Sequence, residues 1–264
     1  MELKLTLQGA MIYATMVLYV VAGLAMLLKF RRVGWVVAAA GFLCASTSWL
    51  YRWAHADHFP AQTMFEVFLT LGMVLPLLSA LGRWGLKTPA SWADMLLGAA
   101  ILFPAGFVAR FAEAPQKLPP ALQSGLFVPH VMAYMAAYVA MAKAAILAVG
   151  EILGRPVLPG LVDYDRATYR MICLGFPLLT LGLVLGSWWA KLAIGDFWHW
   201  DPKELWSLVS WLVYVGYFHL RYRLGRRGRK FQAALALLGL AAIVVTLLAV
   251  TLLPALRGWH SYAD

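Results

Sequence analysis

The segment at residues 188–204 holds the side chains most suited to chemistry, with the sequence WWAKLAIGDFWHWDPKE. Its four tryptophans are Trp188, Trp189, Trp198 and Trp200. Each indole offers a flat, rigid, apolar face and a single N–H, so a group of indoles suits the face of a flat aromatic macrocycle. Lys191 and Lys203 could then contact acidic groups on the edge of that macrocycle. The alternative is a belt of interfacial tryptophans, which any membrane protein can carry.

The end of this segment also has the pattern of a helix start. Asp201 precedes Pro202, and Glu204 follows three residues after Asp201. An N-cap aspartate, a proline at the first helical position and a glutamate at the third form a capping box. We therefore expect Asp201 and Glu204 to brace the segment rather than to transfer protons.

Two of the six histidines are placed where they could bind the metal of a macrocycle that lies against the indole-rich segment. His130 begins one apolar stretch and His260 follows the last one, and we expect both on the same membrane side as residues 188–204. Neutral imidazole is a common axial ligand of haem iron. Two imidazoles from different helices could therefore hold one porphyrin between them, although a single histidine at a membrane surface can also be a plain interfacial residue.

His219 is expected at a different depth. It lies about fifteen residues beyond Glu204 on one helix, which corresponds to roughly 22 Å, so it cannot share a site with His130 and His260. An ionisable residue at that depth indicates a functional role, and the alternative is a side chain that reaches to the membrane surface. If His219 binds iron, the second axial ligand must come from another polypeptide or from a group other than histidine.

A second polar group surrounds His58-Phe59-Pro60. Glu66 follows within an apolar stretch, where a carboxylate is unfavourable unless it is paired, and Arg52 is its candidate partner. A structural role is favoured for His58 and Glu66. The loop residues His55 and His199 are weaker candidates for metal ligands.

The elements that position these residues are membrane-spanning helices. The chain has 264 residues, of which 62% are hydrophobic and 13% charged, whereas a soluble domain is nearer half apolar and a quarter charged. Apolar blocks of about 20 residues cross a bilayer as helices, which satisfy their own backbone groups. We predict an all-α polytopic membrane protein, a single domain over 1–264 with about eight transmembrane helices. The spans are expected near 10–28, 33–53, 62–82, 92–109, 128–149, 170–190, 204–222 and 231–253.

The charge distribution predicts the orientation of these spans. With the N-terminus outside, most of the 22 Lys and Arg residues fall in inner loops, as the positive-inside rule requires. This accounts for the net charge of +10 without a nucleic-acid partner. Both termini and the loop at 188–204 are then extracytoplasmic, in the cell inner (plasma) membrane. The basic run at 221–230 is expected to anchor this topology, and binding of anionic lipid is the alternative. Cys44 and Cys173 are expected to pack within helices.

Several blocks resemble the CcsA/ResC cytochrome c assembly proteins of System II. The Trp-rich segment resembles their WWD motif, and its Asp-Pro-Lys-Glu ending distinguishes it from the haem-delivery subunit of System I. The matching blocks are Arg52-Trp53, His58–Pro60, Glu66, Pro129–Val131, Tyr169–Gly182, Trp198–Trp206, Trp211–Tyr214, His219–Arg221 and Gly258–Tyr262.

The resemblance implies a role for each matching residue. His130 and His260 would be the external axial ligands of haem b, and His219 an intramembrane ligand whose counterpart comes from a CcsB/ResB-like membrane partner. The loop would present the haem to the Cys-x-x-Cys-His segment of an apocytochrome c for thioether attachment, as part of a holocytochrome c synthase. The implied haem-binding residues in and beside the loop are Trp188, Trp189, Trp198, Trp200, Asp201 and Trp206. A b-type electron-transfer subunit and a haem transporter without synthase activity remain as alternatives.

The chain also departs from the family pattern. The family usually has Trp, a small residue, Tyr and a small polar residue at the positions of Ile194, Asp196, Phe197 and His199. It usually has Asn, Tyr and Ser at the positions of Thr63, Phe65 and Val67. Fewer polar and aromatic groups therefore surround the motifs, while His199 adds a candidate ligand or proton donor.

Overall fold

The computed structural model describes residues 3–108, 111, 114, 116–154 and 163–253. This described part is built from helices joined by short connections and contains no β-strand. It forms two compact units, the first comprising Met1–Gly85 and Ala90–Pro119 and the second Leu86–Pro89 and Pro120–Asp264. Each unit buries an apolar core of its own.

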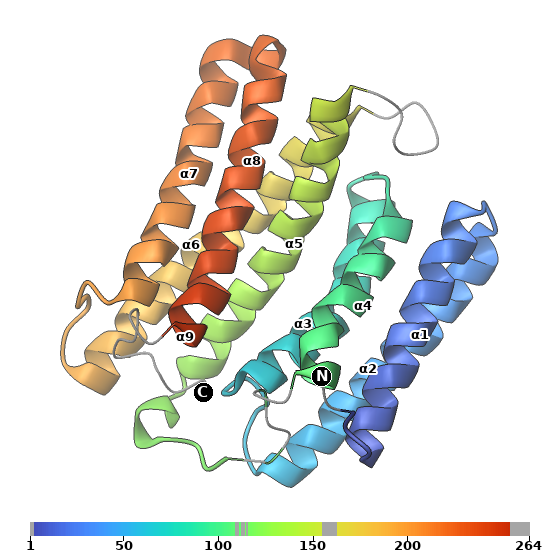
Figure 1. Cartoon of the computed structure of the whole chain (residues 1–264). Helices are drawn as coiled ribbons and strands as arrows, with labels where there is room; N and C mark the ends of the chain where they lie inside the picture. Colours follow the sequence, from blue (N-terminus) through green and yellow to red (C-terminus); the bar gives the residue numbers. More distant parts are fainter. Residues whose placement is uncertain (1–2, 109–110, 112–113, 115, 155–162, 254–264) are drawn as a thin grey trace. The chain divides into compact units, whose positions relative to one another are not determined.

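The long helices of the first unit are labelled α1 to α4 in Figure 1. They are α1 (Leu7–Leu27), α2 (Arg31–Ala56), α3 (Met64–Ala80), extended by the π-helical turn η1 (Leu81–Gly85), and α4 (Ser91–Phe107). Helix α1 packs against α2 and α4, and α3 packs against α4 and α2. The fully buried Tyr19 of α1 donates a hydrogen bond to the carbonyl of Gly72 in α3 at 3.0 Å. This bond satisfies the one polar atom that the ring carries into the core.

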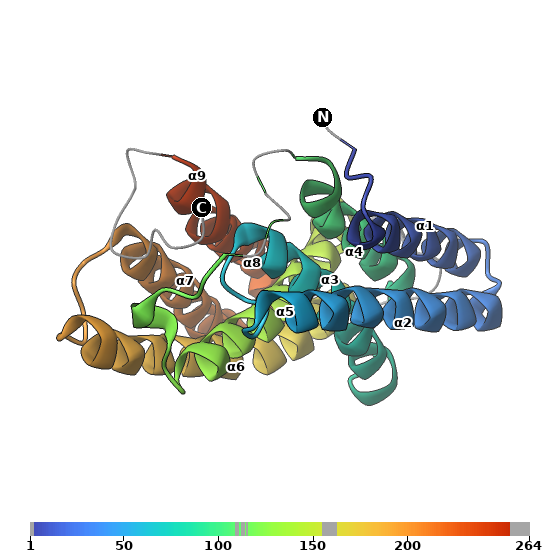
Figure 2. The ribbon, with the colours of Figure 1, turned by 90° about the horizontal axis from the view of Figure 1, so that it is seen from below.

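The second unit consists of two antiparallel helix pairs, which Figures 1 and 2 show from two directions. Its first helical elements are the short 3₁₀ turn η2 (Pro120–Leu122), α5 (Phe127–Leu153) and α6 (Tyr164–Ile194). It continues with α7 (Pro202–Leu224), η3 (Gly225–Gly228), α8 (Arg229–Val244), η4 (Val245–Ala249) and α9 (Val250–Leu252). Helix α5 packs along α6, α7 packs along α8, and α8 also packs against α5.

Polar and ionic contacts join α5, α6, α7 and α8 near the α7–α8 turn. The buried carboxylate of Asp165 in α6 accepts a hydrogen bond from Arg221 of α7. Arg221 also donates to Oε1 of Gln232 in α8 at 2.8 Å. Nearby, Arg226 pairs with Asp163 at 3.0 Å and Arg229 pairs with Glu151 at 3.0 Å. Part of the basic run at 221–230 therefore joins helices to one another, a role beyond that of a topology anchor.

The predicted all-α, multi-pass membrane architecture is confirmed, and the number of long apolar helices in the described residues is close to, though not equal to, the predicted eight spans. Six helical segments of the described chain are long and apolar enough to cross a bilayer. Helix α4 has 17 residues and falls short of this length. The last segment, Pro202–Leu252, runs for 51 residues without a non-helical break and so counts α7 and α8 together. These two helices are antiparallel (Figure 1) and the short turn η3 joins them where a loop was expected, so this one segment holds two of the predicted spans.

Candidate functional site

His130 is held by a backbone hydrogen bond that fixes its tautomer. It lies in the first turn of α5, and its Nδ1 is 2.8 Å from the carbonyl oxygen of Gly182 in α6. A carbonyl oxygen only accepts hydrogen bonds, so Nδ1 carries the proton and Nε2 carries the lone pair. A histidine that ligates a metal through one nitrogen usually donates the other N–H to such an oxygen. In the neutral ring this arrangement places the lone pair on Nε2, the form that a metal-binding histidine takes.

Two aromatic rings fix the orientation of the His130 imidazole. The ring of Tyr134 meets it edge-on, with centroids 5.1 Å apart. The ring of Trp189 lies parallel to it within 5°, with centroids 6.4 Å apart. Trp189 is only 2% exposed, and its Nε1 donates to the carbonyl of Ala121 in η2 at 2.9 Å. Trp189 is thus a buried side chain that lies beside the histidine ring.

The other indoles of the segment differ from Trp189 in exposure. Trp188 is 55% exposed and Trp200 is 70% exposed. Trp198 is half-buried and meets Trp200 edge-on, with centroids 6.0 Å apart. The Nε1 of Trp198 is buried and has no hydrogen-bond acceptor among the described residues. The segment therefore presents two open indole faces and one buried N–H donor.

The predicted loop at 188–204 is mostly helical. Helix α6 continues through Ile194 and ends at Gly195, whose φ of +102° is the left-handed conformation that favours glycine at a helix C-terminus. Only residues 195–201 are non-helical. Lys191 donates its Nζ hydrogen to the carbonyl of Gly195 at 2.6 Å and lies over the ring of Phe197. In this structure Lys191 therefore stabilises the end of α6.

The predicted capping box at the start of α7 is confirmed. The Asp201 side chain accepts a hydrogen bond from the amide of Lys203, and Oε2 of Glu204 accepts one from the amide of Asp201 at 3.3 Å. The same Glu204 oxygen accepts from the amide of His199 at 2.7 Å. The His199 imidazole lies beside this carboxylate, with Nδ1 3.9 Å from Oε1. Glu204 thus joins the loop to the first turn of α7.

Replacing Glu204 with alanine should loosen residues 195–201, because two backbone amides lose their acceptor. The expected cost is about 1–2 kcal/mol, seen as faster hydrogen exchange at the amides of His199 and Asp201. Glu204→Gln is the matched control, because its amide oxygen can accept the same bonds. Equal exchange rates in Glu204→Ala and wild type would mean that the carboxylate does not brace the loop.

The remaining predicted ligands fall in different places. His219 lies on α7 with its side chain exposed at the surface of the second unit. Trp206, on the same helix, is half-buried. His260 lies outside the described residues. Of the three predicted iron ligands, only His130 therefore stands beside the indole-rich segment in the described structure.

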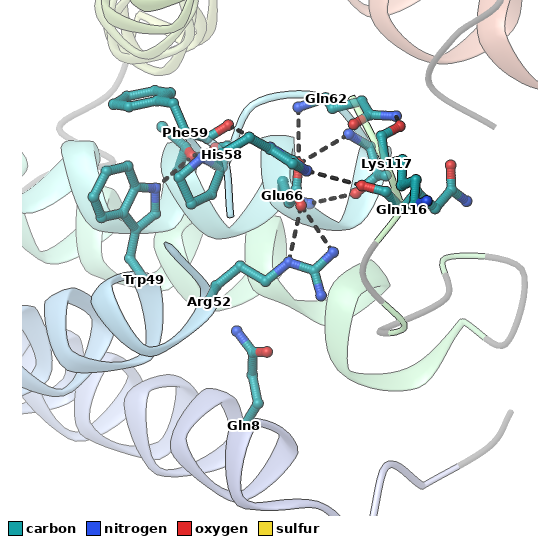
Figure 3. A network of polar contacts seen from close by, with 12 residues as sticks. Gln8, Trp49, Arg52, His58, Phe59, Gln62, Glu66, Gln116 and Lys117 are labelled. Atoms are coloured by element: carbon teal, nitrogen blue, oxygen red, sulfur yellow. Dashed lines mark hydrogen bonds and ion pairs between the residues drawn. The ribbon is translucent and has the colours of Figure 1, made fainter. Parts of the chain in front are cut away.

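The predicted partnership of Arg52 and Glu66 is confirmed in the first unit (Figure 3). Glu66 Oε1 lies 2.9 Å from Nε and 2.8 Å from Nη2 of Arg52, and both side chains are fully buried. Glu66 Oε2 accepts from the amides of Gln62 at 2.8 Å and Thr63 at 3.2 Å. The Thr63 side-chain oxygen in turn accepts a hydrogen bond from the amide of Glu66, which completes a capping box at the start of α3. This pair fixes the turn between α2 and α3.

His58 takes part in the same network. Its Nδ1 lies 3.0 Å from the carbonyl of Phe59, and its Nε2 lies 3.0 Å from the carbonyl of Gln116 (Figure 3). With both ring nitrogens against carbonyl oxygens, His58 joins the α2–α3 turn to the segment that follows α4. This arrangement fits the structural role that the sequence favoured.

Two glycines of α6 lie beside His130 and were not among the site residues predicted from the sequence. Gly182 supplies the carbonyl acceptor, and Gly186 lies directly under the imidazole. Their spacing of four residues on one helix face is a known signal for close helix packing in membranes and could have identified them.

Comparison with known proteins relates this chain to cytochrome c assembly proteins. The sequence model described as "Cytochrome C assembly protein" matches residues 9–257. The cytochrome c biogenesis protein CcsA of Synechococcus elongatus is 30% identical, with 87% of each chain covered. A CcsA of Prochlorococcus marinus is 31% identical over 86% of this chain and 83% of its own.

A solved structure shares the fold. The cytochrome c haem lyase CcmF superposes with a TM-score of 0.65 at 21% sequence identity, and the match covers 91% of this chain. The chain spans 45% of the length of CcmF. At this level of identity the match supports a shared helical fold.

Proposed function

Because the chain belongs to the cytochrome c assembly protein family, we propose that it binds haem b and presents it for thioether attachment to apocytochrome c. The observation that carries this proposal is the hydrogen bond from His130 Nδ1 to the Gly182 carbonyl. That bond leaves the Nε2 lone pair as the coordinating group of the imidazole. Haem is the substrate that this histidine would ligate, with His260 as the proposed ligand on the opposite side of the iron.

The residues around His130 fit a porphyrin. The exposed faces of Trp188 and Trp200 suit a flat apolar ring. The buried Nε1 of Trp198 needs an acceptor, and a polar group of the haem or of the bound apocytochrome could supply one. Asp201 belongs to this site as the cap that fixes the start of α7, so its contribution to haem binding is indirect.

The chemistry requires chiefly orientation from this protein. In thioether attachment the sulfur of a substrate cysteine bonds to a vinyl carbon of haem, and the thiol proton ends on the neighbouring carbon. Holding the vinyl group beside the thiol makes the encounter effectively unimolecular, which can contribute several kcal/mol. The histidine of the Cys-x-x-Cys-His segment would then replace one of the two imidazoles on the iron.

His219 is proposed to serve an earlier step, together with a CcsB/ResB-like partner. Its exposed position on α7 suits a ligand that is completed by another polypeptide. We assign this step to the interior of the cell inner membrane and the site at His130 to the extracytoplasmic face, on the basis of the charge distribution.

The proposal predicts that the chain, purified with its partner from haem-replete cells, carries haem b. We expect a Soret band from non-covalent protohaem, and we expect His219→Ala to reduce the total haem severalfold. Tyr222→Ala is the matched control, because Tyr222 is also exposed near the end of α7. A preparation with no Soret band would exclude haem binding, and equal haem in both variants would exclude a ligand role for His219.

A further inference from the structure

We propose that Gly186 is a positioning residue for haem ligation, because the absence of a side chain there sets the orientation of the His130 imidazole. The inference rests on the proposed function of His130 as an axial ligand. A Cβ atom on Gly186 would lie 2.8 Å from Nδ1 and 3.3 Å from Nε2 of His130, and closer still to Cε1. The imidazole therefore occupies the space that any other residue would fill.

Gly182, one turn earlier on α6, acts on the same face. A Cβ atom there would lie 2.9 Å from the ring of Tyr134. Gly182 and Gly186 are four residues apart on α6, and His130 and Tyr134 are four residues apart on α5, so the two pairs oppose each other. Without side chains at either glycine, the α6 backbone comes close enough for the Gly182 carbonyl to reach Nδ1.

The His130 ring has few ways to move. Tyr134 meets it edge-on and Trp189 lies parallel to it. The backbone of α6 lies on a third side, at Gly186. If a methyl group were added at Gly186, the imidazole is the group that can yield, because it is the end of a side chain with two rotatable bonds. The ring would turn away and lose its bond to Gly182, and with it the preference for a lone pair on Nε2.

The expected result of Gly186→Ala is a folded protein whose haem binding is weakened by about 10- to 100-fold, the effect of losing the hydrogen bond that orients a metal ligand. Its visible bands should shift, since the iron would lose a correctly oriented imidazole. Gly216→Ala is the matched control: Gly216 is also in the middle of a long helix, and nothing lies within 4 Å of an added Cβ. This control should keep the wild-type spectrum.

A double variant separates positioning from simple packing. If Gly186 acts through the imidazole, Gly186→Ala should change haem binding little in a His130→Gly background, because the two substitutions disturb the same interaction. If Gly186→Ala lowered haem binding by the same factor in both backgrounds, Gly186 would be a packing residue and the inference would be wrong.

The same variants remain informative if Gly186→Ala alone does not accumulate. Removing the ring with His130→Gly frees the space for the added methyl group, so the double variant should accumulate; failure of the double variant as well would overturn the inference. Loss of haem in His130→Gly with normal haem in Gly186→Ala would refute this inference alone. Normal haem in His130→Gly would instead refute the proposed function.

Discussion

Replacing His130 with glycine is expected to reduce cytochrome c maturation by at least about tenfold and to remove most haem from the outer site. The substitution deletes the Nε2 lone pair that the Gly182 hydrogen bond reserves for coordination. It also leaves a space of imidazole size between Tyr134, Trp189 and Gly186. The measurement is the visible spectrum of the purified protein, together with the yield of holocytochrome c in the same cells.

Added imidazole should partly restore both properties in His130→Gly. The free ligand can enter the space left by the side chain, donate to the Gly182 carbonyl and coordinate iron through its other nitrogen. Because rescue requires the shape and the hydrogen bond of an imidazole, a general loss of folding would not be reversed in this way.

His55→Ala is the control for this experiment. His55 is exposed at the end of α2, where its Nδ1 bonds the carbonyl of Tyr51 one turn earlier. Its replacement should leave the haem spectrum unchanged. If His130→Gly showed a wild-type spectrum and normal maturation, His130 would not be an iron ligand.

The sequence was most informative where structure depends on local spacing or on a buried charge. The capping box of α7 was predicted from Asp201 and Glu204, three positions apart, and it forms. The pair of Arg52 and Glu66 could be predicted because a carboxylate in an apolar helix needs a cation, and few cations were within reach. The apolar blocks likewise identified the membrane helices.

The sequence was less informative where tertiary packing decides the outcome. Adjacent Trp188 and Trp189 look alike in the sequence, yet one is exposed and the other is buried against η2, because they point to different sides of α6. The end of α6 was placed too early, since nothing before Gly195 prevents the helix from continuing. The acceptor of the His130 bond is a main-chain carbonyl, which no residue type reveals.

Breaking the ion pair in the first unit should have the largest effect on stability. Arg52→Met is expected to destabilise the protein by about 3 kcal/mol or more, because Glu66 remains buried without its cation. The thermal midpoint in detergent should fall by roughly 10 °C. Tryptophan fluorescence can follow the transition, since Trp49 and Trp53 both contact Phe59 in the turn that this pair fixes.

The double variant Arg52→Met/Glu66→Gln tests whether the cost comes from the unpaired charge. Glutamine is neutral, yet its amide oxygen can still accept from the amides of Gln62 and Thr63. A neutral pair of similar volume often matches a buried ion pair in stability, so the double variant should recover more than half of the loss. If it were as unstable as Arg52→Met, the loss would stem from the packing of the Arg52 side chain over Phe65 rather than from its charge. A wild-type midpoint for Arg52→Met would mean that Glu66 is adequately satisfied by the backbone amides alone, and that the turn carrying His58 does not depend on the ion pair.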